Sequence, residues 1–293
     1  MHSRRHWLSA AAAAACAIGA NAQAREAYAE LPGVRVWYTD SGGPGVPVVF
    51  LHAATGSSRV WEYQIPAFTA AGYRVIAYDR RGYGRTMIDP AGINPPGVDP
   101  ASPQPSTGAD DLENLIDYLK IDRFHLVGTA AGGFTALDYA LSFPQRLRSL
   151  VVANSIGGVV DADYQQLGRR IRPPQFDALP PEVRELGPSY RAGNPEGTEH
   201  WVTLEHASRA PGPPGPAQTM RNRITFSLLE TIKVPTLLLT GAADMYAPPP
   251  LLKLFAARIK NSESAIVPEA GHSAYWENPD VFNRAVLQFI RQH

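Results

Sequence analysis

The sequence predicts an α/β protein built on a mostly parallel, twisted β-sheet with helices on both faces. Short apolar runs alternate with longer helical segments along most of the 293 residues. Residues 46–51 form one such run, nearly continuous in apolar side chains, which is typical of a buried parallel strand. Strands that alternate with helices require a parallel sheet covered on both sides. With 44% hydrophobic residues, the chain can fill the core of one large domain.

The first elements follow from hydrophobic patterning. Residues 34–39 alternate like an edge strand, and residues 46–51 form the buried strand that follows. A helix that includes residues 61–71 precedes a strand over residues 73–78. A proline-rich stretch at 87–105 leaves no room for a helix, and no role is assigned to it.

The middle of the chain continues the same alternation. Residues 110–120 place their leucines and isoleucine on one helical face, and Thr107-x-x-Asp110 resembles a capping box at the helix start. The apolar run 124–127 predicts a strand that enters a glycine-flanked turn and then a helix at 134–140. A further strand is expected at 150–153.

The alternation stops after Asn154. Residues 157–231 carry no strand pattern, are rich in proline, and predict one helix at about 201–209. Strand and helix signals return beyond this segment, at 234–240, 250–260, 264–267 and a last helix that begins at Asn278-Pro279. We therefore expect a core of residues 25–154 and 232–293, with residues 155–231 inserted into it.

The N-terminal residues 1–24 are expected to be an export signal. Arg4 and Arg5 precede an alanine-rich segment at 10–20, and small-residue cleavage sites follow at 20–22 and 22–24. The paired arginines resemble a twin-arginine signal, which predicts a periplasmic or secreted protein. An ordinary alanine-rich helix is the alternative. The segment is too short and too weakly apolar to stay as a permanent membrane anchor.

Composition narrows the classes of partner. Lys plus Arg and Asp plus Glu are equal at 27 each, and no basic stripe with aromatics is present, which argues against nucleic-acid binding. The only cysteine, Cys16, lies in the expected signal, so no thiolate metal site or cysteine nucleophile is expected in the mature chain. The sequence does not determine the oligomeric state.

The turn after the strand at 124–127 carries the most informative motif. Residues 128–132 read Gly-Thr-Ala-Ala-Gly, which matches the G-x-S-x-G nucleophile elbow with Ala130 in the place of serine. Other motifs occur in order along the chain: the loop at 51–56, the segment at 79–86, the segment at 241–244 and the segment at 270–273. Together these motifs resemble the α/β-hydrolase superfamily from about residue 34 to the C-terminus. That resemblance implies the α/β-hydrolase fold and makes residues 155–231 a helical lid.

The resemblance also implies roles for individual residues. His272 would be the general base, and Asp244 would orient its ring. The backbone amides of Ala54 and Ala131 would form the oxyanion hole, with Ala130 at the nucleophile position. His52 is interpreted as a structural hydrogen-bonding residue, and Ser57 and Ser58 are poor candidates for a replacement nucleophile.

Three interpretations of Ala130 remain open. In the first, Ala130 is an engineered serine-to-alanine substitution. In the second, it is a natural variant in which His272 and Asp244 activate water or perform non-hydrolytic base chemistry of lyase or decarboxylase type. The third interpretation is a non-catalytic protein that binds a small ligand. The retained acid and base favour the first two.

The resemblance implies a small ester or lactone as the substrate, with no metal and no organic cofactor. Trp201, Tyr246 and Tyr275 are candidates to line an apolar substrate chamber. Glu205, His206 and Arg209 form a polar group that either reaches an anionic or polar substrate or is solvated.

Overall fold

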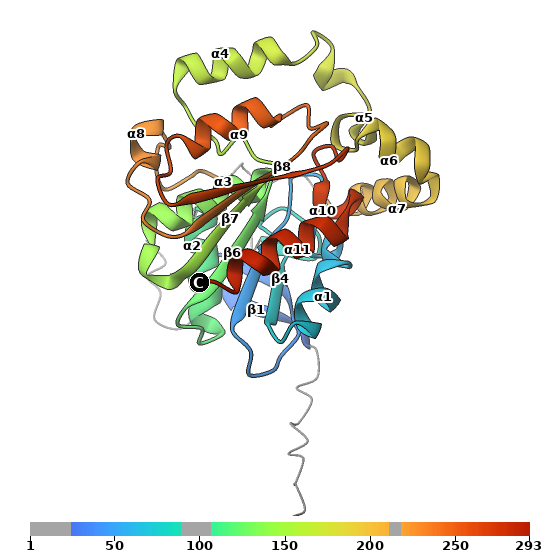
Figure 1. Ribbon diagram of the computed structural model, residues 1–293. Helices are drawn as coiled ribbons and strands as arrows, with labels where there is room; N and C mark the ends of the chain where they lie inside the picture. The colour runs from blue at the N-terminus through green and yellow to red at the C-terminus, as the bar shows by residue number, and fades with distance from the viewer. Residues whose placement is uncertain (1–24, 89–106, 211–217) are drawn as a thin grey trace, which may run out of the picture.

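A computed structural model describes residues 25–88, 107–210 and 218–293. It contains one nine-stranded sheet in the order β1-β2-β4-β3-β6-β7-β8-β9, with β5 paired to β2. Helices cover both faces of the sheet (Figure 1). The predicted α/β-hydrolase fold, with a mostly parallel twisted sheet, is confirmed.

The strands are β1 Arg25–Leu31, β2 Val34–Asp40, β3 Pro47–Leu51, β4 Arg74–Tyr78, β5 Met87–Ile88, β6 Phe124–Thr129, β7 Leu147–Ala153, β8 Thr236–Gly241 and β9 Ser262–Val267. The helices are α1 Gln64–Ala70, α2 Gly108–Tyr118, α3 Ala131–Ser142, α4 Ala162–Ile171, α5 Pro181–Glu185, α6 Pro188–Gly193, α7 Pro195–His206, α8 Phe226–Leu229, α9 Pro249–Ala256, α10 Ala274–Glu277 and α11 Pro279–Ile290.

The sheet is parallel from β4 to β9 and antiparallel at its first edge. β1 pairs antiparallel with β2 along its whole length, and β2 pairs antiparallel with β4. Hydrophobic patterning did not predict β1, and it placed residues 34–39 at the edge. The structure corrects this, because β1 lies between β2 and solvent.

Alternating side chains of the strands pack into two hydrophobic cores, one on each face of the sheet. In β3, Val49 and Leu51 pack with residues of α2, α3 and α9, whereas Val48 and Phe50 pack with residues of α1 and α11. Because successive strand side chains point to opposite faces, one apolar run fills both cores. This accounts for the continuous apolar run at 46–51 in the sequence.

The described residues between β7 and β8 contain helices and connecting loops but none of the strands of the sheet. The sequence predicted one helix there, at about 201–209, but the structure has five, α4 to α8, and α7 spans Pro195–His206. Pro181, Pro188 and Pro195 each stand at the start of a helix. Proline is well tolerated at the first helical position, so these residues begin helices instead of interrupting them.

The start of α2 agrees with its sequence signal. The Thr107 hydroxyl accepts a hydrogen bond from the Asp110 amide, and the Asp110 carboxylate accepts one from the Thr107 amide, which completes the capping box. Within the described parts of the chain, no helix has the length and hydrophobicity of a membrane span. The expected export signal at 1–24 and most of the stretch at 87–105 lie outside the described residues.

Candidate active site

The motif residues gather at the carboxyl ends of the parallel strands. β3, β6, β7, β8 and β9 run parallel, so their carboxyl ends lie together. His52, Ala130, Asn154, Asp244 and His272 all follow these strand ends in the chain. In open α/β sheets this end of the strands is where ligands bind.

Ala130 lies at the tip of the turn between β6 and α3. Its backbone has φ 50° and ψ −117°, a conformation that is costly for a residue with a Cβ. Three hydrogen bonds hold it there: its amide donates to the Ala153 carbonyl at 3.0 Å, and its carbonyl accepts from the Ser155 hydroxyl at 2.8 Å and from the Gly133 amide at 3.0 Å. The surrounding structure therefore fixes this strained residue in place.

The glycines around Ala130 are required by close backbone contacts. A Cβ on Gly128 would lie 2.5 Å from the Gly132 carbonyl oxygen. A Cβ on Gly132 would lie 2.3 Å from the Leu51 carbonyl oxygen. Neither position has space for a side chain, so the sharp turn depends on both glycines.

The side chains of His272 and Asp244, each from one of the sequence motifs, lie in hydrogen-bond contact. The His272 Nδ1 atom lies 2.9 Å from each carboxylate oxygen of Asp244, and both side chains are buried. Because an ionised carboxylate can only accept, Nδ1 carries the proton and Nε2 is left as the basic nitrogen. Burial lowers the pKa of His272, but Asp244 and Glu185 outweigh it and hold that pKa above its usual value. Burial raises the pKa of the Asp244 carboxyl, but the interactions of this carboxylate with His272 and other donors outweigh burial and hold that pKa below its usual value.

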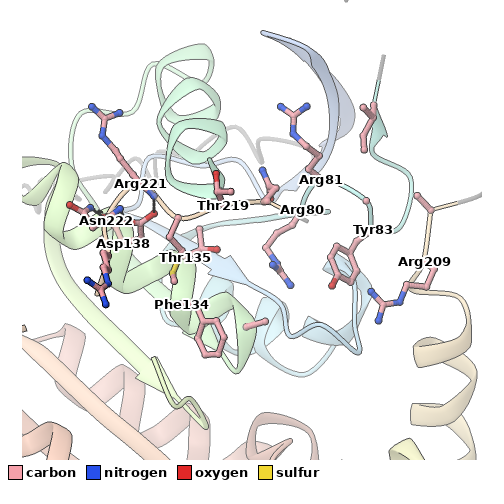
Figure 2. A pocket seen from close by; sticks show the side chains of 18 residues that line it. Arg80, Arg81, Tyr83, Phe134, Thr135, Asp138, Arg209, Thr219, Arg221 and Asn222 are labelled. Carbon is pink, nitrogen blue, oxygen red and sulfur yellow. Dashed lines mark hydrogen bonds between the residues drawn. The ribbon is translucent and has the colours of Figure 1, made fainter. Parts of the chain in front are cut away.

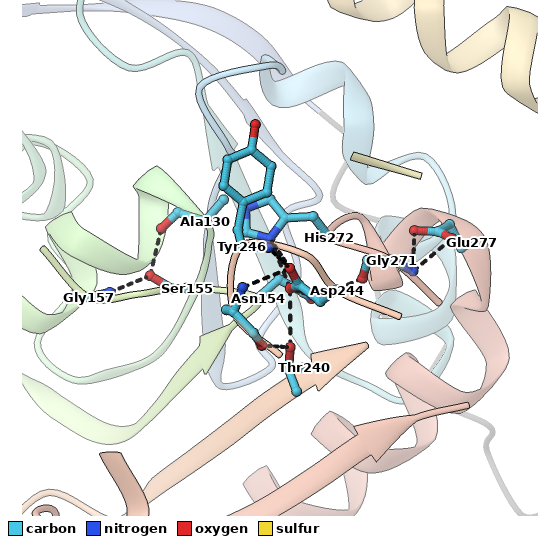
Figure 3. Close-up of polar contacts among 11 residues, drawn as sticks. Ala130, Asn154, Ser155, Gly157, Thr240, Asp244, Tyr246, Gly271, His272 and Glu277 are labelled. Atoms are coloured by element: carbon cyan, nitrogen blue, oxygen red, sulfur yellow. Dashed lines mark hydrogen bonds and ion pairs between the residues drawn. The ribbon is translucent and has the colours of Figure 1, made fainter. Parts of the chain in front are cut away.

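Several donors besides His272 hold the Asp244 carboxylate. The amides of Tyr246 and Ala247 donate to Oδ1, at 2.7 and 2.8 Å. Asn154 Nδ2 and the Thr240 hydroxyl donate to Oδ2, at 3.0 and 3.1 Å (Figure 3). The sequence analysis missed Asn154, which also donates to the Gly271 carbonyl and thereby ties the acid to the loop that bears the base. Its one sequence signal is a polar residue directly after a buried strand.

His52 has the structural role expected for it. It is fully buried, and its Nε2 atom accepts a hydrogen bond from the Arg80 amide at 3.0 Å. Nδ1 therefore carries the proton and donates to the Ala53 carbonyl at 2.7 Å. Burial and the nearby Arg80 keep the pKa of His52 well below its usual value, so the ring stays neutral. These bonds fix the loop that leads to Ala54.

Ala54 and Ala131 lie beside Ala130 along a cavity of about 360 Å³. Ala131 is the first residue of α3, so its amide has no acceptor within the helix. Among the described residues, no group accepts a hydrogen bond from the amide of Ala54. Both N–H groups are therefore available to a ligand in the cavity.

The same cavity brings together Ala130, His272 and Tyr246. The rings of Tyr246 and His272 lie 4.3 Å apart between centroids, and Figure 3 shows the phenol alongside the imidazole. Burial and Glu185 raise the pKa of Tyr246 to about 12, so the phenol is neutral. The volume suits a small molecule.

Charged side chains from the segment between β7 and β8 also line this cavity. They are Arg172, Arg184, Glu185 and Arg209. Glu185 is 5% exposed, and its Oε2 atom has no hydrogen-bond partner among the described residues. Burial raises the pKa of this carboxyl. Nothing in the sequence pattern singled out Glu185, Arg172 or Arg184, because only the tertiary fold brings them to the cavity.

Two expected substrate contacts are corrected. Trp201 and Tyr275 are each 1% exposed and belong to the hydrophobic core with Phe282, away from the cavity wall. The Tyr275 ring instead packs 4.8 Å from the ring of Trp61. An aromatic residue near a motif serves the core as readily as a pocket, and here the core holds both.

The two serines of the loop after β3 do not reach the cavity either. Ser57 and Ser58 are buried, and the Ser58 amide donates to Asp79 at 2.7 Å. Asp79 also accepts from the Arg85 amide at 2.8 Å, so it stabilises the turn that follows β4. No cluster of side chains suited to a metal ion exists among the residues that the structure describes.

Comparisons with known proteins agree with this architecture. A model of the alpha/beta hydrolase family matches residues 48–285. A 2-hydroxy-6-oxononadienedioate/2-hydroxy-6-oxononatrienedioate hydrolase of Burkholderia vietnamiensis is 27% identical over 291 residues, covering 88% of this chain and 92% of the relative. A 2-hydroxy-6-oxo-6-phenylhexa-2,4-dienoate hydrolase of Comamonas testosteroni is 26% identical over 277 residues, covering 86% and 90%.

Solved structures show the same likeness. The thermophilic esterase of Thermogutta terrifontis superimposes with a TM-score of 0.69 at 25% sequence identity, covering 92% of this chain and 99% of the esterase. The family model covers well over half of the chain, and the strand order places its motifs at the carboxyl ends of the parallel strands. The chain belongs to the α/β-hydrolase family.

Proposed function

We propose that the protein hydrolyses a small carboxylic ester or lactone at the cavity between Ala130 and His272. The observation that carries the proposal is the buried pair of His272 and Asp244, whose free Nε2 atom is on the ring that lines this cavity. A general base held by a carboxylate is the machinery of acyl transfer. A protein that only binds a ligand has no use for it.

The chemistry without a serine hydroxyl would use water as the nucleophile. Because Ala130 has no hydroxyl and lines the same cavity as His272, a water molecule would take the place of that hydroxyl beside the imidazole. His272 Nε2 would take a proton from this water as its oxygen attacks the carbonyl carbon. The oxyanion that forms would accept hydrogen bonds from the amides of Ala54 and Ala131. As the intermediate collapses, the proton on His272 would pass to the leaving alkoxide.

Ala130 keeps the backbone geometry that a nucleophilic serine would need. Its positive φ is held by bonds to Ala153 and Ser155, so a hydroxyl added at this position would face the same cavity. We infer that Ala130 stands at the nucleophile position of the family. The likeness to an esterase at 25% identity supports an ester as substrate.

We further propose that residues 155–210 and 218–231, the described part of the expected insertion, form a lid over the site. The support is that Arg172, Glu185 and Arg209, all from this segment, line the cavity that contains His272. Ligand access would then depend on how these helices move relative to the sheet.

The test is an activity screen of the purified protein on p-nitrophenyl acetate and small lactones. His272→Ala in the same chain is the control for base catalysis, and Ala130→Ser tests the nucleophile position. We expect slow hydrolysis that His272→Ala abolishes, and a large gain with Ala130→Ser. Hydrolysis that is unaffected by His272→Ala would contradict the proposal, as would a folded Ala130→Ser variant that gains nothing.

A further inference from the structure

A second charged cavity adjoins the site. It is lined by residues of the segment after β4, of α3 and of the segments next to Arg209 and Thr219. Ala131, Phe134 and Arg209 line both this cavity and the one that contains His272. A ligand that fills one cavity can therefore extend into the other.

Arg80 is a buried cation in the wall of this cavity. Its side chain is almost fully enclosed, with the residue 8% exposed, and Nε and Nη2 have no hydrogen-bond partner among the residues that the structure describes. No carboxylate in the described part of the chain forms a salt bridge with Arg80 or with Arg209. A guanidinium remains charged in proteins, so burying one without an anion is unfavourable.

Tyr83 is the main contact of both cations. The Arg80 guanidinium carbon lies 4.7 Å from the centre of the Tyr83 ring, and that of Arg209 lies 4.8 Å from it. Figure 2 shows the two guanidinium groups on either side of the Tyr83 ring. Cation–π contacts recover only part of what a buried guanidinium loses in leaving water. Two like charges on one ring also repel each other, and an anion between or beside them would remove that repulsion.

We propose that Arg80 and Arg209 form a carboxylate-binding subsite, so that the substrate is an ester or lactone that carries a second, anionic group. The proposal rests on the proposed hydrolase function for the reacting group, and on the two guanidinium groups for the anion. A carboxylate matches the forked donors of arginine. Because Arg209 and Ala131 line both cavities, an anion held here would leave the ester group beside the proposed oxyanion amides.

The test measures binding directly, so that it does not depend on turnover. Monomethyl succinate and its neutral analogue dimethyl succinate are titrated into the protein by calorimetry at low ionic strength. We expect the monoanion to bind about 10- to 100-fold more tightly than the diester, and added salt to reduce the difference. Equal affinity for the two compounds would overturn the proposal.

Variants locate the subsite. Arg209→Gln changes an exposed residue and is expected to remove most of the preference for the monoanion, as is Arg80→Gln if it folds. Arg85→Gln is the matched control, because Arg85 also stacks on an aromatic ring, that of Trp37, but pairs with Glu26 outside both cavities. A preference that survives Arg209→Gln, or that is lost equally in Arg85→Gln, would contradict the assignment.

The failure of one proposal can be told apart from the failure of the other. Tight, Arg209-dependent binding of the monoanion without hydrolysis would support the subsite and contradict the hydrolase. Hydrolysis of neutral esters with no preference for the monoanion would do the reverse.

Discussion

Replacing Asp244 with asparagine tests the acid–base pair at its most constrained point. Oδ1 accepts hydrogen bonds from the backbone amides of Tyr246 and Ala247. These N–H groups can only donate, and their directions are fixed by the backbone. The carbonyl oxygen of the new side chain must therefore take the place of Oδ1, and its NH₂ group that of Oδ2. There it meets the Asn154 donor and the His272 Nδ1 atom.

The consequence for His272 is a change of tautomer. An NH₂ group donates to Nδ1, which moves the ring proton to Nε2 and removes the basic lone pair from the cavity. In serine hydrolases the wrong tautomer lowers kcat roughly 10⁴-fold, equivalent to about 5.5 kcal/mol. The new NH₂ group would also face the NH₂ group of Asn154, donor against donor. This is expected to lower the free energy of unfolding by about 1–3 kcal/mol.

The assay is kcat/KM for p-nitrophenyl acetate as a function of pH, in the Ala130→Ser background so that a large loss can be measured. Because Asp244 raises the pKa of His272 and the base must be neutral, activity should fall as the pH drops through that raised pKa. In Asp244→Asn the residual activity should lose that limb or show it at lower pH. Asp40→Asn is the control: Asp40 is buried and paired with Arg74 at 2.6 Å, at the opposite edge of the sheet. Activity within tenfold of the parent in a folded Asp244→Asn protein would refute this reasoning.

Two further substitutions test packing and burial. Gly132→Ala should lower the free energy of unfolding by about 1–3 kcal/mol in urea, since its Cβ would lie 2.3 Å from the Leu51 carbonyl. Gly168→Ala, in open space on α4, should instead stabilise by about 0.4–1 kcal/mol, and equal effects of the two changes would contradict the contact. Glu185→Gln should raise the free energy of unfolding at pH 8 by about 1–3 kcal/mol and change it little at pH 4. Burial raises the pKa of Glu185 in the folded protein above its value in the unfolded chain. The carboxyl therefore leaves the free energy of unfolding unchanged at a pH below the unfolded-state pKa, and it lowers that free energy as the pH rises from there through the folded-state pKa. No pH dependence in the difference between Glu185→Gln and the parent would count against this.

The elements that sequence analysis predicted best are those with local signals. The run at 46–51 is apolar on both faces because β3 contributes to two cores. The capping box at Thr107 and the helix start at Asn278-Pro279 are set by side chains within a few residues. His272 and Asp244 were paired in advance by the resemblance to the α/β-hydrolase superfamily, and in the structure each follows the end of a parallel strand.

Other features depended on contacts that no local pattern encodes. β1 is a strand because it pairs with β2, and three prolines that resemble helix breakers in sequence begin helices. Tyr275 lies close to a motif in sequence and Trp201 lies in the inserted segment, yet their packing puts both in the core. Arg80 carries no signal of its own in the sequence, since only the fold shows that it is buried and that two of its nitrogens have no hydrogen-bond partner in the described part of the chain.

The most direct test of the site is covalent labelling at position 130. The Ala130→Ser protein is treated with an alkyl fluorophosphonate and its intact mass is measured. If position 130 faces His272 and the amides of Ala54 and Ala131, one adduct should form on Ser and should be lost when His272→Ala is added. A folded Ala130→Ser protein that stays unlabelled would show that these groups do not form one reacting centre.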